Sequence, residues 1–460
     1  MEERNSNGLL TAPVPLLLRR LAIPAGTGFL FVTLFNVADT FYAGFISTTA
    51  LAALALTFPL FFLIVAVAGG ISTGATALIG HALGRNDRPG GELLAMQSLS
   101  FALIHGLALS LSGYLLAPPL LSLLGAVGET QQLAILYIRI IFLGSPLLVM
   151  NHACNAILNA QGDTAGFRNF IVMGALANMI LDPWFMYGGI GMPPLGLAGI
   201  ALATVSVHFA GIFFLLRRAM KTGLVRFAAL RMAWPRPRIF GRLFAQAFPS
   251  SLNMLTVALG VFVITWFVGR FGAAAVAAYG IASRIEQLIL MPVMGLNVAT
   301  LAVVAQNSGA GMVQRVRQTI VTALRYGITL TSIGALAALF FASHLVGIFS
   351  ADPEVIVVGQ GYLRIASFVF VAYVILYINV FAWQGLKRPL LAVWLGLYRQ
   401  ILAPVPVFYL FAIVFNQGVV GVWWGILAVT WSAALMALII THRILASISS
   451  DMTAGNSRKD

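Results

Sequence analysis

Three acidic residues lie inside long apolar stretches of the sequence, where a carboxylate could bind a proton or a cation. Asp39 lies in FNVADTFYAG, Asp182 in ANMILDPWF and Glu286 in ASRIEQL. A carboxylate in the hydrocarbon region of a membrane costs several kcal/mol unless it is protonated, paired or bound to an ion. Each of the three is therefore a candidate functional residue.

Polar neighbours of Asp39 and Asp182 extend the possible site. Asn36 precedes Asp39 by about one helical turn and Thr40 follows it directly, while Asn178 precedes Asp182 by four residues and so shares its helix face. Carboxylate, amide and hydroxyl oxygens suit a sodium ion or a shared proton. The alternative is a structural pair of carboxylates that water satisfies.

Glu286 lies two residues after Arg284, so the two side chains point to different faces of a helix. We expect Glu286 to pair with another arginine or with loop backbone rather than to couple ions.

The fourth apolar stretch carries a line of polar residues. Asn151, Asn155 and Asn159 step by four, and Tyr137 lies close to four turns earlier. A polar stripe on a membrane helix faces the bundle interior or a water-filled cavity, so the asparagines are candidates for the substrate cavity. In the first stretch, Pro24 removes a backbone hydrogen bond and predicts a bend.

The composition requires membrane helices to position these residues. Of the 460 residues, 60% are hydrophobic and 9% are charged, against roughly 25% charged in soluble proteins. About 20 apolar residues span a bilayer, so the chain can supply about a dozen spans. This excludes a cytosolic enzyme, a disordered chain and, with the single Cys154, a disulfide scaffold.

The net charge of +14 indicates topology rather than nucleic acid. Most arginines and lysines fall in the termini and in loops on the side of the termini, and cytoplasmic loops collect such residues. We therefore expect both termini in the cytoplasm and anionic lipid as the partner of the basic surface, with no nucleic acid.

An internal repeat divides the chain into two halves. Pro24, Gly44 and Gly70 recur as Pro249, Gly269 and Gly295, at a constant offset of 225 residues. Later in the halves the match slips by two residues, so that Gln161 meets Gln384. The second half has Ile264 at the position of Asp39 and, after this slip, Val405 at the position of Asp182. The halves predict an all-α protein of twelve transmembrane helices in two pseudo-symmetric six-helix bundles, an architecture typical of transporters. The expected parts are a tail (1–15), the N-terminal bundle (16–220), a basic linker (221–240), the C-terminal bundle (241–447) and a tail (448–460).

At this level of detail the chain resembles the multidrug and toxic compound extrusion (MATE) family, in its DinF-like branch. The resemblance covers nearly the whole chain and rests on Pro24 with FNVADTFYAG, Tyr137, NMILDP, GIALAT and the paired helix ends GHALGR and AQNSGAG. Acids that NorM-like members carry in the C-terminal half are absent, which favours the DinF-like branch and leaves Glu286 without a role.

The resemblance implies a cation site and a function. The site would comprise Asp39, Asn178, Asp182 and Thr204, with Na⁺ as a possible ion and Pro24, Asn36 and Tyr137 in support. The chain would be a secondary active multidrug efflux transporter that exports amphipathic, often cationic, compounds by antiport against H⁺ or Na⁺. It would be neither an enzyme nor dependent on a cofactor, and would act as a monomer in the inner membrane of a prokaryote.

Three other functions compete with this one. A lipid-linked oligosaccharide flippase of the same superfamily would have more than twelve spans and a cationic cavity for pyrophosphate. An intramembrane aspartyl protease using Asp39 and Asp182 would carry YD and GxGD motifs, whereas the sequence reads VADTF and ILDPW. A receptor that does not transport leaves the duplication and the buried acids unexplained.

Overall fold

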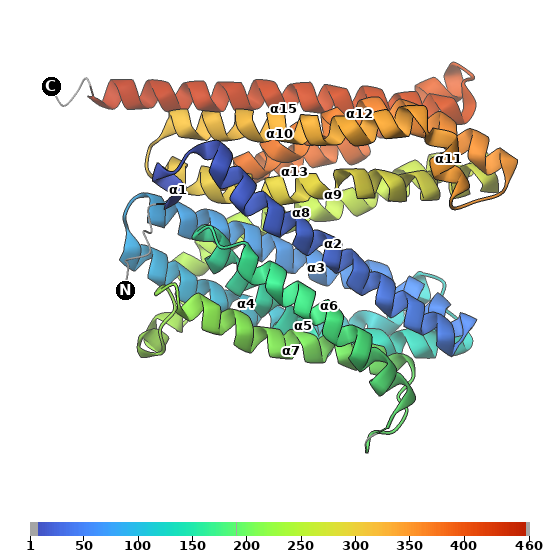
Figure 1. Ribbon diagram of the computed structural model, residues 1–460, viewed down its shortest axis with the longest axis horizontal. Coiled ribbons are helices and arrows are strands. Elements are labelled where there is room, and N and C mark those ends of the chain that lie inside the picture. The colour runs from blue at the N-terminus through green and yellow to red at the C-terminus, as the bar shows by residue number, and fades with distance from the viewer. Residues whose placement is uncertain (1–7, 190, 457–460) are drawn as a thin grey trace. The chain divides into compact units, whose positions relative to one another are not determined.

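The computed structural model describes residues 8–189 and 191–456, and these are almost entirely helical (Figure 1). Within them, 12 helical segments are long and apolar enough to cross a membrane. This confirms the number of spans predicted from the hydrophobic runs. Residues 1–7 and 457–460 of the predicted tails lie outside the described residues.

The first half contains six spans. A short helix, α1 (Gly8–Thr11), precedes them and a 3₁₀ helix, η1 (Phe227–Ala233), follows them. The spans are α2 (Val14–Ile46), α3 (Thr48–Gly84), α4 (Arg88–Leu123), α5 (Gly128–Ala160), α6 (Ala165–Tyr187) and α7 (Leu197–Met220).

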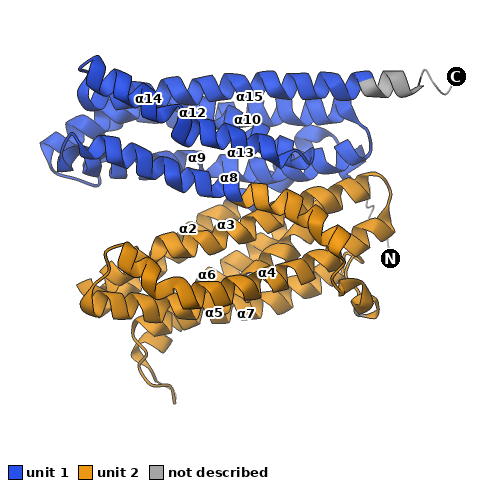
Figure 2. Ribbon diagram, turned by 180° about the vertical axis from the view of Figure 1, so that it is seen from behind, with its two compact units in different colours: residues 1–26, 252–460 blue, residues 27–251 orange. Residues whose placement is uncertain are grey.

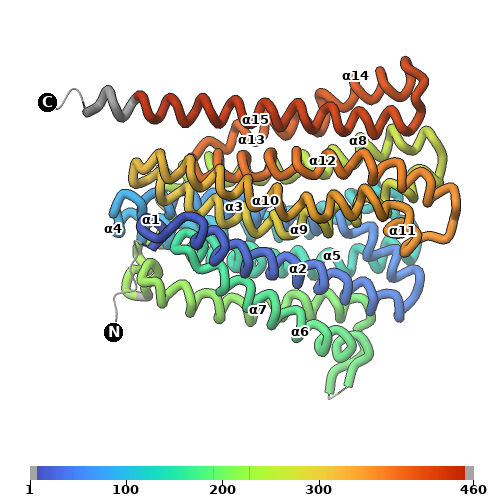
Figure 3. Tube along the Cα trace, turned by 45° about the horizontal axis from the view of Figure 1, so that its top comes forward, coloured from blue at the N-terminus to red at the C-terminus, as the bar shows by residue number. Residues whose placement is uncertain are grey.

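The second half also contains six spans, one of which is interrupted. The continuous spans are α8 (Pro237–Gly269), α9 (Ala273–Gly309), α10 (Val313–Phe340), α12 (Pro353–Gly385) and α15 (Gly418–Asn456). A short helix, α11 (Ala342–Gly347), lies between α10 and α12 in the sequence. The eleventh span consists of α13 (Pro389–Leu397), a π-helix η2 (Tyr398–Leu402), α14 (Pro404–Phe408) and a second π-helix η3 (Tyr409–Val414). Figure 3 shows α15 as one long coil with α14 beside it.

The chain forms two compact units, which Figure 2 shows in different colours. Unit 1 comprises residues 1–26 and 252–460, and unit 2 comprises residues 27–251. The two breaks, after residues 26 and 251, lie 225 residues apart, which is the offset of the sequence repeat. The bundle bounds 16–220 and 241–447 stay a prediction of the repeats, and they differ from these compact units at their edges.

Each repeat therefore contributes the start of its first helix to the other compact unit. In unit 1, a Cβ added to Gly295 on α9 would meet the backbone oxygen of Ala22 and the backbone nitrogen of Gly26 on α2. In unit 2, a Cβ added to Gly70 on α3 would meet the equivalent atoms of Ala247 and Ser251 on α8. Glycine is required at both positions because two helix backbones approach each other there.

The core of unit 2 is arranged around α5. This helix packs against α3, α4 and α7, and small buried residues such as Ala153, Ala156 and Ala160 let the helices approach closely. In unit 1 the corresponding centre is α12, which packs against α9, α10 and α15. These two helices carry Tyr137 and Tyr362, which interact with the acidic residues described below; the acidic residues themselves lie on α2, α6 and α9.

Candidate functional site

Four polar side chains from three helices of unit 2 form one buried cluster. Asp39 lies on α2, Asn178 and Asp182 on α6, and Thr204 on α7. Asp39 is 6% exposed, and Asn178 and Asp182 are 0% exposed. The structure thus brings together the four residues for which the sequence resemblance implied a common site.

Asn178 joins the two carboxylates. Its Nδ2 donates one hydrogen bond to Asp39 Oδ1 at 2.8 Å and a second to Asp182 Oδ2 at 3.2 Å. Thr204 Oγ1 lies 3.4 Å from Asp39 Oδ2 and 3.2 Å from the Ile200 carbonyl oxygen of its own helix, so the hydroxyl divides its donation between them. The i, i+4 spacing of Asn178 and Asp182 on α6 is what places both beside Asp39.

Two acceptors of the cluster have no hydrogen-bond partner among the described residues. They are Asn178 Oδ1 and Asp182 Oδ1, and both are buried. The two carboxylates also act on each other electrostatically, and like charges at short range in a low dielectric are unfavourable. The arrangement therefore demands a positive charge, which a proton on one carboxylate or an oxygen-bound cation would supply.

A tie between α2 and α6 was not anticipated from the sequence. Pro183 has no backbone N–H, so the carbonyl of Met179, four residues earlier, lacks its helical donor. The hydroxyl of Tyr42 donates to that carbonyl oxygen at 3.0 Å. Since Tyr42 follows Asp39 by three residues, this bond holds the acidic turn of α2 against α6. Pro183, directly after Asp182, was the sequence signal that the Met179 carbonyl oxygen would need another donor.

The predicted supporting residues differ in their relation to the cluster. Tyr137 on α5 is buried and interacts electrostatically with both Asp39 and Asp182. Asn36 is exposed, and its side chain has no hydrogen bond to Asp39 among the described contacts; its carbonyl oxygen accepts a bond of 2.9 Å from Thr40. Pro24 lies within α2, two residues before the boundary of unit 1.

The first residue of the asparagine stripe of α5, Asn151, contacts α7. Asn151 is completely buried, and its Nδ2 donates to the His208 carbonyl oxygen at 2.9 Å. The side-chain oxygens of Asn151 and Asn155 are buried without a partner among the described residues, and Asn159 is also buried. A role for these residues in the substrate cavity stays a prediction.

Glu286 belongs to a different cluster, in unit 1. It accepts a hydrogen bond of 2.7 Å from the Tyr362 hydroxyl, and it interacts electrostatically with Arg399. Its hydrogen-bond partner is therefore a tyrosine, where an arginine or loop backbone was expected. The nearby Arg284 makes none of the ion pairs found among the described residues.

Asn178 can be tested separately from the carboxylates. Asn178→Ala removes the amide that joins them among the described residues, so we expect the dye efflux that the family resemblance implies to fall about tenfold, the effect of losing a hydrogen bond to a buried charge. Efflux of ethidium from cells, corrected for the amount of protein in the membrane, measures this. Asn169→Ala, on the same helix but outside the cluster, should keep wild-type efflux; equal rates in both variants would contradict the linking role.

Comparison with known proteins identifies the class of molecule. The profile of the MatE family matches residues 24–184 and 249–410. An FAD transporter of Shewanella oneidensis is 29% identical over 409 residues, covering 88% of this chain and 89% of that protein. The multidrug export protein MepA of Staphylococcus aureus is 24% identical over 446 residues, covering 94% of each chain.

Solved structures agree over nearly the whole chain. A MATE crystal structure described as being in the bent conformation has a TM-score of 0.91 at 25% identity, covering 98% of this chain and 99% of that one. Another, described as being in the straight conformation, has a TM-score of 0.88 and covers 98% and 100%. The matched relatives are transporters, so the chain is a multi-pass membrane transporter and not a protease. With the family profile matching more than half of its residues, the chain belongs to the MatE family of multidrug and toxic compound extrusion transporters.

Proposed function

We propose that this transporter is a secondary active exporter of amphipathic compounds that works by antiport against H⁺ or Na⁺. Asp39 is the primary carrier of the coupling ion, and Asp182 and Asn178 hold the ion beside it. Among its relatives, the name of MepA refers to multidrug export, so cationic amphiphiles are the first substrates to test. No cofactor beyond the coupling ion enters this scheme.

The observation that carries the proposal is the composition of the buried cluster. Two carboxylates share one amide donor, and two further buried oxygens, from Asn178 and Asp182, have no partner among the described residues. A cluster so rich in acceptors is stable only with a proton or a cation in it. An ion that must be bound inside the membrane can be exchanged for a substrate, which is the requirement for antiport.

The bend predicted at Pro24 offers a route from ion to substrate. α2 carries both Pro24 and Asp39, and the boundary of the compact units falls at Gly26. Neutralising Asp39 would remove a charge that otherwise demands polar partners, and α2 could then move against α6 and α7. Solved relatives are described as being in a bent and in a straight conformation, so proteins of this fold adopt more than one conformation.

The placement in the membrane follows from the basic linker. We propose that residues 221–240 lie at the cytoplasmic surface, with both termini on the same side, in contact with anionic lipid. Gln97 of α4 anchors this segment, because its Nε2 donates to the Trp234 carbonyl oxygen at 2.7 Å and its Oε1 accepts from the Arg236 N–H at 2.9 Å. Trp234, two residues before Arg236, is exposed, as expected of a tryptophan at a membrane interface. We further propose that the transporter is a monomer in the inner membrane, and that it belongs to the DinF-like branch.

Ion flux in proteoliposomes tests the proposed function. Purified protein is reconstituted with a pH-sensitive dye inside the vesicles, and radioactive sodium uptake is measured in parallel. Addition of ethidium, or of a flavin dinucleotide in view of the Shewanella relative, should drive a counterflow of one of the two ions. Substrate movement with neither proton nor sodium counterflow would rule out the antiport mechanism.

A further inference from the structure

A basic residue, Arg399, lies inside a predicted membrane span, on the interrupted helix of unit 1. Arg399 is part of the π-helix η2, between α13 and α14. Ala403 donates its backbone N–H to the Tyr398 carbonyl oxygen five residues back, and Pro404 has no N–H to continue the regular ladder. Single π-turns in membrane helices are frequent at functional sites, and charged residues at this depth are functional candidates by default.

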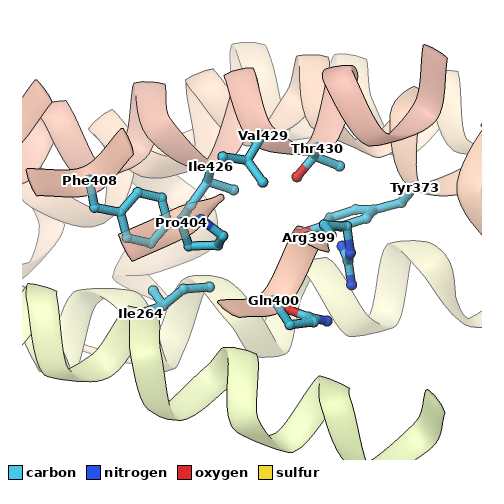
Figure 4. A pocket seen from close by; sticks show the side chains of 9 residues that line it. All are labelled: Ile264, Tyr373, Arg399, Gln400, Pro404, Phe408, Ile426, Val429 and Thr430. Atoms are coloured by element: carbon cyan, nitrogen blue, oxygen red, sulfur yellow. The ribbon is translucent and has the colours of Figure 1, made fainter. Parts of the chain in front are cut away.

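Arg399 borders a small cavity with a polar end and an apolar end. Figure 4 shows Tyr373, Arg399, Gln400 and Thr430 at one end, and apolar side chains of α8, α14 and α15 at the other. The cavity holds about 20 Å³, which is room for a group slightly larger than one water molecule. It can therefore receive one polar group of a ligand but not a whole drug-sized molecule.

The charge at the polar end of this cavity is positive. The ion pairs found among the described residues involve Arg85, Arg218 and Arg226. Arg399 forms an ion pair with none of the described carboxylates. The guanidinium carbon lies 5.1 Å from the centre of the Tyr373 ring, which stabilises the cation without neutralising it. Glu286 acts on Arg399 electrostatically from a greater distance, while accepting the Tyr362 hydroxyl.

The donor types at this end also favour an anion. Arg399 offers guanidinium N–H groups, Gln400 an amide and Thr430 a hydroxyl, and guanidinium groups bind carboxylate and phosphate in a fixed two-bond geometry. Gln400 is packed against α8, where a Cβ added to Gly260 would meet its Oε1. The polar end is thus built by close packing rather than by loose surface side chains.

We propose that the Arg399 cavity binds the carboxylate of an amphipathic molecule whose apolar part extends along α14. The inference rests on the proposed function and deepens it, because it adds acidic amphiphiles to the substrates of the transporter. The Glu286 carboxylate competes with the anionic ligand for Arg399. Removing the charge of Glu286 should therefore strengthen ligand binding, whereas removing the charge of Arg399 should weaken it.

Two dyes with the same ring system test the proposal. Fluorescein is anionic and rhodamine 6G is cationic, and both share a xanthene core. We expect Arg399→Gln to weaken fluorescein binding to the detergent-purified transporter about tenfold, as for loss of a charge-assisted contact, and to leave rhodamine 6G binding unchanged. Glu286→Gln should strengthen fluorescein binding, and Arg399→Lys should retain part of it. Arg325→Gln changes an exposed arginine of α10 in the same unit and, as the matched control, should change nothing. Fluorescence anisotropy measures all five proteins.

Several outcomes would overturn the proposal. They are absence of fluorescein binding to the wild type, equal weakening of both dyes in Arg399→Gln, or weaker fluorescein binding in Glu286→Gln. If acetate displaces fluorescein as effectively as an unlabelled amphiphilic carboxylate does, the cavity recognises a free anion and the amphiphile assignment is wrong. Binding in detergent needs no ion gradient, so loss of antiport with fluorescein binding intact refutes the proposed function alone.

Discussion

Replacement of Asp39 or Asp182 by asparagine is expected to abolish drug export while leaving the transporter folded and inserted. Asparagine keeps the shape of the side chain and can still pair with Asn178, so the packing of α2 against α6 is preserved. It cannot take up a proton and carries no charge for sodium, so ion binding no longer changes the cluster. The measurement is ethidium efflux from cells that express each variant at the wild-type level.

Two further carboxylates serve as controls for this experiment. Glu129 is exposed at the start of α5, and Glu129→Gln should export normally. Glu286→Gln should reduce export less than either aspartate variant does. Unchanged export in both Asp39→Asn and Asp182→Asn would refute the assignment of the ion site, and loss of export in Glu286→Gln alone would place that site in unit 1.

Ligand affinity in the wild type is expected to fall when pH is lowered or sodium is added, and Pro24→Ala should suppress that dependence. If ion binding lowers the affinity for substrate, substrate binding must lower the affinity for the ion by the same factor, because coupling between two sites is reciprocal. The 15 residues between Pro24 and Asp39 cover about 22 Å of helix. Alanine restores the missing backbone donor, so α2 should lose one of its two states and the link between the sites. Dye affinity measured across pH and sodium concentration gives the result.

The internal repeat supplies a matched control for the proline. Pro249 occupies the equivalent position in α8, which carries Ile264 where α2 has Asp39. Pro249→Ala perturbs a helix of the same length in the same register without touching an acidic residue, so its ion dependence should equal that of the wild type. If the wild-type affinity ignores both ions, the coupling hypothesis fails; if Pro24→Ala keeps the full dependence, the bend is not the route.

The sequence predicted those features that depend on spacing within one helix. The i, i+4 step of Asn178 and Asp182 and the apolar runs that became spans are of this kind. Contacts between distant residues left weaker signals. The bond from Tyr42 to the Met179 carbonyl depends on a proline removing a donor elsewhere, and the partner of Glu286 lies 76 residues away, at Tyr362.

The interrupted eleventh span shows a second limit of sequence reasoning. Hydropathy finds an apolar run there but does not report the winding of its backbone. Pro404 and Pro406 lack the N–H of a regular helix, but neither these prolines nor the π-turn that carries Arg399 entered the prediction. The cavity beside it combines residues of four segments of the second half, and no pattern local to any one of them points to it.

The exchange of helix ends at Gly70 and Gly295 has a consequence for the ancestry of the chain. Neither sequence repeat contains all the residues of one compact unit, because each unit takes the start of its first helix from the other repeat. A single ancestral six-helix chain could complete its packing only by trading this segment with a second copy, as a domain-swapped dimer. Fusion of two such copies turns the trade into an internal one. In the present chain one polypeptide carries both repeats, so each compact unit is completed without a second copy.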